Sequence, residues 1–118
     1  VCMLRPGVSG LSDNIIVRST VGRFLEHSRI FFFRNNGKDD LFLSSADWMD
    51  RNFFRRVEIA FPILNEKLKK RIFDEGLQMH LAENAINWKM SSDGSYQLRK
   101  NSSNQTISCQ DGLLKKYS

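Results

Sequence analysis

Two short turn signals, each set between apolar runs, constrain the fold of this 118-residue chain more than any other feature. The segment Asn35–Asp40 contains an Asn-Gly pair and separates the runs His27–Arg34 and Leu41–Ser45. An Asp-Gly pair marks the second turn, Ser91–Ser95. This turn separates the runs Ile86–Met90 and Tyr96–Arg99. Because such pairs accept the backbone angles of tight turns, both segments predict β-hairpins.

Three further apolar runs are predicted as strands. Val1–Leu4 is expected to be a buried strand, and Ile15–Arg18 is short and rich in β-branched residues. Val57–Ile63 is interrupted near its end by Pro62. Since proline cannot donate a hydrogen bond to a sheet, Pro62 should lie at an edge or at the exit of that strand.

The longest helix is predicted to begin near Asn65, which suits an N-cap position. Apolar side chains then recur at helical spacing, at Leu68, Ile72, Phe73, Leu77, Met79 and Ala82. Val21–Glu26 could form one further helical turn, and Gly112–Ser118 has the pattern of a helix that stops early. Strands separated by one clear helix, with hairpins between them, predict one domain of the α/β class with a mixed sheet and flanking helices.

Composition excludes some classes of protein and favours others. Apolar residues make up 41% of the chain, and no apolar run approaches the roughly 20 residues that a bilayer requires. The net charge of +5 favours polyanions as partners. Cys2 and Cys109 are too few for a disulfide framework and are expected to be reduced thiols of a cytoplasmic protein. The apolar start and the short final helix suggest a piece of a larger protein.

His27 and Arg29 are the strongest candidates for catalysis. Side chains at positions i and i+2 of a strand share a face, so these two should project together. Histidine can attack phosphorus or move a proton, and arginine offers a planar fork of donors that matches phosphate oxygens. The same two residues are equally compatible with an ordinary histidine and arginine on the surface that have no catalytic role. The other histidine, His80, lies within the long predicted helix and is expected to have a structural role.

A second polar cluster, Ser44–Asn52, leaves the predicted strand Leu41–Ser45. Its hydroxyls and backbone amides, from Ser44 and Ser45 onward, could hold phosphate oxygens together with Asp47 and Arg51. The alternative is a capped turn in which Asp47 or Ser45 satisfies the start of a helix. Positive charge is added nearby by Arg51, Arg55 and Arg56, although such charge runs are often only a solvated face.

Several motifs closely resemble the C-terminal catalytic region of bacterial polyphosphate kinases. In chain order these motifs are Leu4–Gly7, Gly10–Ile15, Val21–Ile30, Ser44–Met49, Arg51-Asn52 and Arg56–Glu58. The match covers residues 1–100, which would form a phospholipase D-like half-domain, one half of a two-half catalytic region. Residues 101–118 would form a loop and the start of the family's final helix, over Asp111–Tyr117.

The resemblance implies reversible transfer of the terminal phosphate of ATP to inorganic polyphosphate, with Mg²⁺ that accompanies ATP and has its ligands mostly outside this chain. The phosphorylated histidine would belong to the other half, and His27 would match the second histidine, which contacts the nucleotide phosphates. The implied partners are ATP or ADP, polyphosphate and the remaining domains of a homo-oligomeric enzyme, with no specific nucleic acid. The protein is expected in the cytoplasm, with peripheral attachment to a membrane left open.

The phospholipase D pattern itself is matched only in part. His27-Ser28-Arg29 resembles its His-x-Lys, and Ser44-Ser45-Ala46-Asp47 resembles its Gly-Ser-x-Asn. However, Arg34 stands where that pattern has an acidic residue, which weakens a phosphodiesterase interpretation. Two alternatives stay open. One is a phospholipase D-like phosphodiesterase half that dimerises and so brings two copies of His27 together, and the other is a module that binds polyphosphate or nucleic acid without catalysis.

Overall fold

The computed structural model describes residues 2–99 and 106–118, which form two compact units. One unit is the continuous segment Glu26–Met79, and the other combines Val1–Leu25 with His80–Ser118. Each unit contains one three-stranded antiparallel sheet and helical segments, so the predicted α/β class is confirmed, with two antiparallel sheets in place of the expected single mixed sheet. Within the described residues, no helix is both long and apolar enough to cross a membrane.

The sheet of the unit Glu26–Met79 has the strand order β2-β3-β4. Strands β2 (Ile30–Phe33) and β3 (Asp40–Ser44) pair antiparallel, which confirms the first predicted hairpin. Its turn contains positive φ angles at Asn35, Asn36 and Gly37, which asparagine and glycine tolerate better than other residues. Leu41 of β3 is only 1% exposed and anchors the small core of this unit.

Strand β4 (Ala60–Pro62) lies at the edge of this sheet and ends at Pro62, as predicted. Ser45 and Ile63 each donate a backbone hydrogen bond across the β3–β4 pair, to Ile59 and Leu41 respectively. Because backbone polar groups alternate in direction along a strand, Pro62 turns its nitrogen toward the open edge. The missing N–H of proline therefore costs the sheet no hydrogen bond.

The long helix begins at α2 (Glu66–Phe73), and the Asn65 side chain caps it by accepting a hydrogen bond from the Leu68 N–H at 3.1 Å. It continues through the π-helical turn η2 (Asp74–Gln78) into α3 (Met79–Leu81). Phe73 packs on Phe32 of β2 with ring centroids 4.5 Å apart. A Cβ at Gly76 would lie 2.3 Å from Ile30 Cδ1, so only glycine allows this close approach without a shift.

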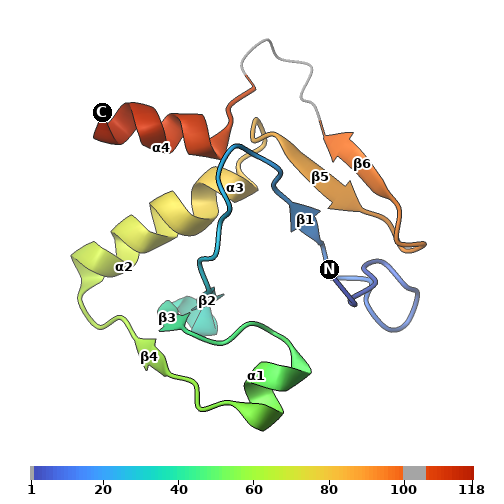
Figure 1. Cartoon of the computed structure of the whole chain (residues 1–118), viewed down its shortest axis with the longest axis horizontal. Coiled ribbons are helices and arrows are strands. Elements are labelled where there is room, and N and C mark those ends of the chain that lie inside the picture. Colours follow the sequence, from blue (N-terminus) through green and yellow to red (C-terminus); the bar gives the residue numbers. More distant parts are fainter. Residues whose placement is uncertain (1, 100–105) are drawn as a thin grey trace. The chain divides into compact units, whose positions relative to one another are not determined.

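The short helix α1 (Asp50–Arg55) lies in the connection between β3 and β4 (Figure 1). Its N-cap is Met49, and no side chain caps it. The expectation that Asp47 or Ser45 would cap a helix here is therefore wrong. Asp47 instead accepts a hydrogen bond from Arg29, and Ser45 donates one to Glu58. Both side chains thus belong to the polar cluster described below.

The sheet of the other unit has the order β1-β5-β6, with β1 (Arg18–Ser19), β5 (Asn87–Met90) and β6 (Tyr96–Arg99). The antiparallel pairing of β5 with β6 confirms the second predicted hairpin. Asp93 stabilises its turn by accepting hydrogen bonds from the Ser95 backbone N–H and hydroxyl.

Helix α4 (Cys109–Tyr117) confirms the predicted C-terminal helix but begins earlier than expected, because the Ser108 side chain caps it. The predicted loop 101–110 is therefore wrong at Cys109 and Gln110, while its residues 101–105 lie outside the described residues. The Gln110 amide donates to the backbone carbonyl of Phe24 and accepts from its N–H. These bonds occupy groups that a helix needs, so the predicted helical turn Val21–Glu26 is wrong.

The N-terminal prediction also fails for the described residues Cys2–Leu4. They form no strand, and Met3 is 91% exposed. In the described part of this sheet, β5 pairs with β1 and β6, and Cys2–Leu4 pair with none of these strands. An apolar run becomes a buried strand only where a neighbour supplies its hydrogen bonds.

Candidate functional site

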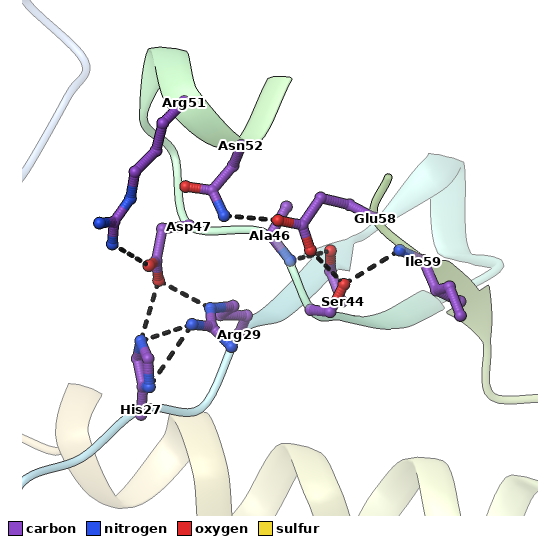
Figure 2. A network of polar contacts seen from close by, with 10 residues as sticks. His27, Arg29, Ser44, Ala46, Asp47, Arg51, Asn52, Glu58 and Ile59 are labelled. Carbon is purple, nitrogen blue, oxygen red and sulfur yellow. Dashed lines mark hydrogen bonds and ion pairs between the residues drawn. The ribbon is translucent and has the colours of Figure 1, made fainter. Parts of the chain in front are cut away.

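His27 and Arg29 lie just before β2 rather than within it, so the predicted strand His27–Arg34 begins too early. The backbone pairing nevertheless extends past the strand, because the Ser44 N–H donates to the Arg29 carbonyl at 3.0 Å. This bond fixes Arg29 beside the loop that follows β3. The two side chains do project together, as predicted, and Figure 2 shows them meeting at the carboxylate of Asp47.

Asp47 is the centre of this cluster. Its Oδ1 accepts a hydrogen bond from Arg29 Nε at 2.7 Å and lies 3.0 Å from His27 Nε2. Its Oδ2 lies 3.6 Å from a terminal nitrogen of Arg51, one helical turn later in the chain. The structure therefore brings His27, Arg29 and Arg51 together around a single carboxylate (Figure 2).

The charge of Asp47 is set by its neighbours. The hydrogen bond from Arg29 is the main reason that the pKa of Asp47 is lowered to about 2, and the hydrogen bond with His27 lowers it further. The same contact raises the pKa of Arg29. Asp47 is thus a carboxylate at neutral pH and can only accept hydrogen bonds.

The contact with Asp47 favours a proton on Nε2 of His27. A carboxylate has no proton to give, so the His27–Asp47 contact is a hydrogen bond only when Nε2 is protonated. Arg29 NH2 also approaches Nε2, and a protonated Nε2 cannot accept from it. In the neutral ring Nδ1 is then the nitrogen that keeps its lone pair.

A second group of contacts holds the loop that carries Asp47. Ser45 donates from its hydroxyl to Glu58 and accepts from the Ile59 N–H at 3.0 Å. Asn52 of α1, 2% exposed, donates to the other oxygen of Glu58 at 2.6 Å. These bonds from Ser45 and then Asn52 lower the pKa of Glu58. The loop is consequently tied both to α1 and to the segment before β4.

The other predicted residues are less closely involved. Ser44 accepts a hydrogen bond from the Ala46 N–H at 3.0 Å and so shapes the same loop. Arg55 and Arg56 are exposed. His80 belongs to the other unit, where its Nδ1 lies 3.3 Å from the Thr20 hydroxyl, and its structural role stays a prediction.

Sequence reasoning missed the part played by Glu58. Two signals were available: a glutamate within the apolar run Val57–Ile63, where a charge is unexpected, and its place in the motif Arg56–Glu58. Asn52 was placed in the polar cluster, but nothing in the sequence predicted its burial against Glu58. Its Oδ1 is buried without a hydrogen-bond partner among the described residues.

The free energy of unfolding should fall as the pH drops from about 4 to 2. The pKa of Asp47 is lower in the folded chain, about 2, than the unfolded value of about 3.9. Its contribution is therefore complete above the unfolded pKa and is lost as the pH falls through the folded pKa. Denaturant unfolding at several pH values should show that the free energy of unfolding depends less on pH in Asp47→Asn than in the wild type. Glu58 should account for part of the pH dependence that stays in this variant. Asp50→Asn is the control and should keep the pH dependence of the wild type. The same change of unfolding free energy with pH in Asp47→Asn and in the wild type would contradict this prediction.

Comparisons with known proteins agree with one another. Residues 1–110 match the family model described as "Polyphosphate kinase C-terminal domain 2". A polyphosphate kinase from Burkholderia lata is 58% identical over 118 residues, which cover 99% of this chain and 17% of that protein. One from Paraburkholderia phytofirmans is 63% identical over 100 residues, covering 85% of this chain and 15% of that protein.

The fold is shared with a solved structure. The crystal structure of polyphosphate kinase from Porphyromonas gingivalis matches with a TM-score of 0.82 and 37% identity, over 90% of this chain and 16% of that one. The expected phospholipase D-like α/β fold class is confirmed by this match. The predicted boundary at residue 100 stays a prediction. The chain spans about a sixth of the length of these relatives, and it belongs to the polyphosphate kinase family, as its second C-terminal domain.

Proposed function

We propose that this chain supplies one half of the site at which a polyphosphate kinase transfers the terminal phosphate of ATP, reversibly, to inorganic polyphosphate. The observation that supports this most is the convergence of His27, Arg29 and Arg51 on one loop. The His27 side chain is 63% exposed, so a substrate can reach it. A histidine with two guanidinium groups suits the handling of phosphate oxygens.

In the proposed reaction, the bond between the terminal phosphorus of ATP and its bridging oxygen breaks, and ADP leaves. The phosphoryl group is carried on a histidine of the other half and then passes to an oxygen at the end of the polyphosphate chain. His27 gives a proton to the departing oxygen or stabilises the incoming one. Arg29 and Arg51 neutralise charge that develops on the phosphoryl group.

The serines have a less direct place in this proposal. Ser45 already uses its only hydroxyl proton on Glu58, and Ser44 accepts from the loop backbone. Phosphate binding by Ser44 and Ser45 therefore stays a prediction, and their observed contacts support a role in shaping the loop that carries Asp47.

Mg²⁺ is proposed to enter with ATP. Among the described residues, no group of three or more His, Cys, Asp or Glu side chains could hold a metal ion. The two carboxylates of the cluster are already engaged, Asp47 by Arg29 and His27, and Glu58 by Ser45 and Asn52. Substrate phosphates and other parts of the enzyme would then supply the ligands, as is common for this ion. Assembly of the whole enzyme into a homo-oligomer in the cytoplasm belongs to the same proposal.

The function is tested by comparing the full-length enzyme with this chain alone. The full-length enzyme, given ATP and Mg²⁺, should extend polyphosphate, which is measured by incorporation of labelled phosphate. The 118-residue chain should form no polyphosphate and no phosphohistidine, because the other half of the site is absent. Phosphorus NMR that detects a stable phosphohistidine on His27 would contradict the proposed division of roles. Release of nitrophenol from bis-nitrophenyl phosphate by a dimer of the chain would favour a phosphodiesterase instead.

A further inference from the structure

We infer that Asp47 is a positioning residue for phosphoryl transfer, holding Arg29 and His27 in the orientation that receives a phosphate, rather than a phosphate ligand itself. The inference rests on the proposed function. It follows from which atoms Asp47 contacts and which it leaves available.

Asp47 holds Arg29 through Nε and leaves the edge between the two terminal nitrogens to other partners. Its Oδ1 accepts from Nε at 2.7 Å, so the edge formed by NH1 and NH2 is not used by the carboxylate. In the part of the chain that the structure describes, NH1 donates no hydrogen bond and NH2 approaches only the ring of His27. Two parallel N–H groups on such an edge match two oxygens of a phosphate.

The same carboxylate oxygen orients His27. It lies 3.0 Å from Nε2, which fixes the plane of the ring relative to Arg29 and leaves Nδ1 without a carboxylate partner. One oxygen atom thus sets the relative orientation of both groups that the proposed reaction uses. A carboxylate that orients a histidine in this way acts through it, without touching the substrate.

Charge argues against direct phosphate binding by Asp47. Phosphate oxygens and a carboxylate are both anionic acceptors. They repel each other, and neither can donate a hydrogen bond to the other. The surrounding cations offset this repulsion, since Asp47 carries one negative charge against the two guanidinium groups of Arg29 and Arg51. Asp47, Arg29 and Arg51 taken together therefore keep a net positive charge while their geometry is fixed.

Asp47 is itself well placed to act as a fixed support. Its side chain is only 23% exposed, against 63% for His27. The loop that carries it is tied to Glu58 through Ser45. Glu58 is tied in turn to α1 through the buried Asn52 (Figure 2). A support needs this restraint, because a catalytic group that moves by about 1 Å can lose a hundredfold in rate.

The test is a steady-state comparison of Asp47→Ala and Asp47→Asn in the full-length enzyme with ATP, Mg²⁺ and polyphosphate. Asp47→Ala should lower kcat by about tenfold to a hundredfold, with little change in the KM for ATP or polyphosphate. Asp47→Asn should recover part of kcat, since its amide oxygen can still accept from Arg29 Nε. Asp50→Ala removes the same charge three residues later, from an exposed side chain for which no contact with His27, Arg29 or Arg51 is found among the described residues, and should behave like the wild type.

Other outcomes would overturn the inference. A lower KM with unchanged kcat in both Asp47 variants would mean that the carboxylate only competes with phosphate. A matching loss of thermal stability, with no recovery in Asp47→Asn, would mean that it only supports the fold. If Asp47→Ala is fully active while His27→Ala is inactive, the inference fails and the proposed function stands. If His27→Ala is also fully active, the proposed function fails as well.

Discussion

Replacement of His27 by alanine in the full-length enzyme is expected to lower the rate of polyphosphate synthesis by about tenfold or more. Imidazole is the only kind of side chain around Asp47 that can both give and take a proton, since the Asp47 carboxylate only accepts hydrogen bonds and the arginines only donate them. The rate is measured by incorporation of labelled phosphate from ATP. The unfolding temperature should stay unchanged, because the side chain is 63% exposed.

The chain provides its own control for this experiment. His80, which bonds to Thr20 in the other unit, can be replaced by glutamine, and this variant should keep its activity. A His27→Ala enzyme that turns over at a near-normal rate would remove His27 from the mechanism, whatever the phosphate-binding role of its neighbours.

Replacement of Arg29 by alanine is expected to lower kcat by about a hundredfold, the usual loss when a donor aimed at transition-state charge is removed. Arg29→Lys should recover only part of this, because lysine keeps the charge but has neither the planar fork nor an Nε–H for Asp47. Both variants are measured with saturating ATP and polyphosphate, so that kcat is separated from KM.

The matched control is Arg34→Ala, which removes the same charge from an exposed arginine paired with Asp39. This variant should retain its activity. If Arg29→Lys equals the wild type, only the charge of Arg29 matters, and its fixed orientation has no catalytic value. If Arg34→Ala loses as much as Arg29→Ala, the effect is general electrostatic attraction of polyanions rather than action at the site.

The parts of the fold that could be predicted are those governed by local chemistry. The Asn36-Gly37 and Asp93-Gly94 turns accept backbone angles that few residues tolerate, and both hairpins form where they predict. Asn65 caps its helix because its side chain reaches an N–H three residues away. Each of these signals is complete within a few consecutive residues.

The failures involve partners distant in the sequence. The amide of Gln110 holds the backbone of Phe24 across 86 positions, which no local pattern around Val21–Glu26 could show. The side chains that meet at Asp47 were candidates from the sequence, but no local pattern predicted their arrangement, and their membership of a functional site stays a prediction. Asp47 meets His27 across 20 positions, and its role emerged only from the atoms that it contacts. The support from Glu58 depends on Asn52 being buried, which is a property of packing.

The outward-facing nitrogen of Pro62 has a consequence for contacts between molecules. An unpaired strand edge normally invites a strand from another copy, since its N–H and C=O groups are ready to bond. At the rim of β4, an incoming strand would find no donor at Pro62, and β4 is only three residues long. The proline therefore discourages intermolecular β-sheet growth, and with it aggregation, at the very edge where the sheet would otherwise extend.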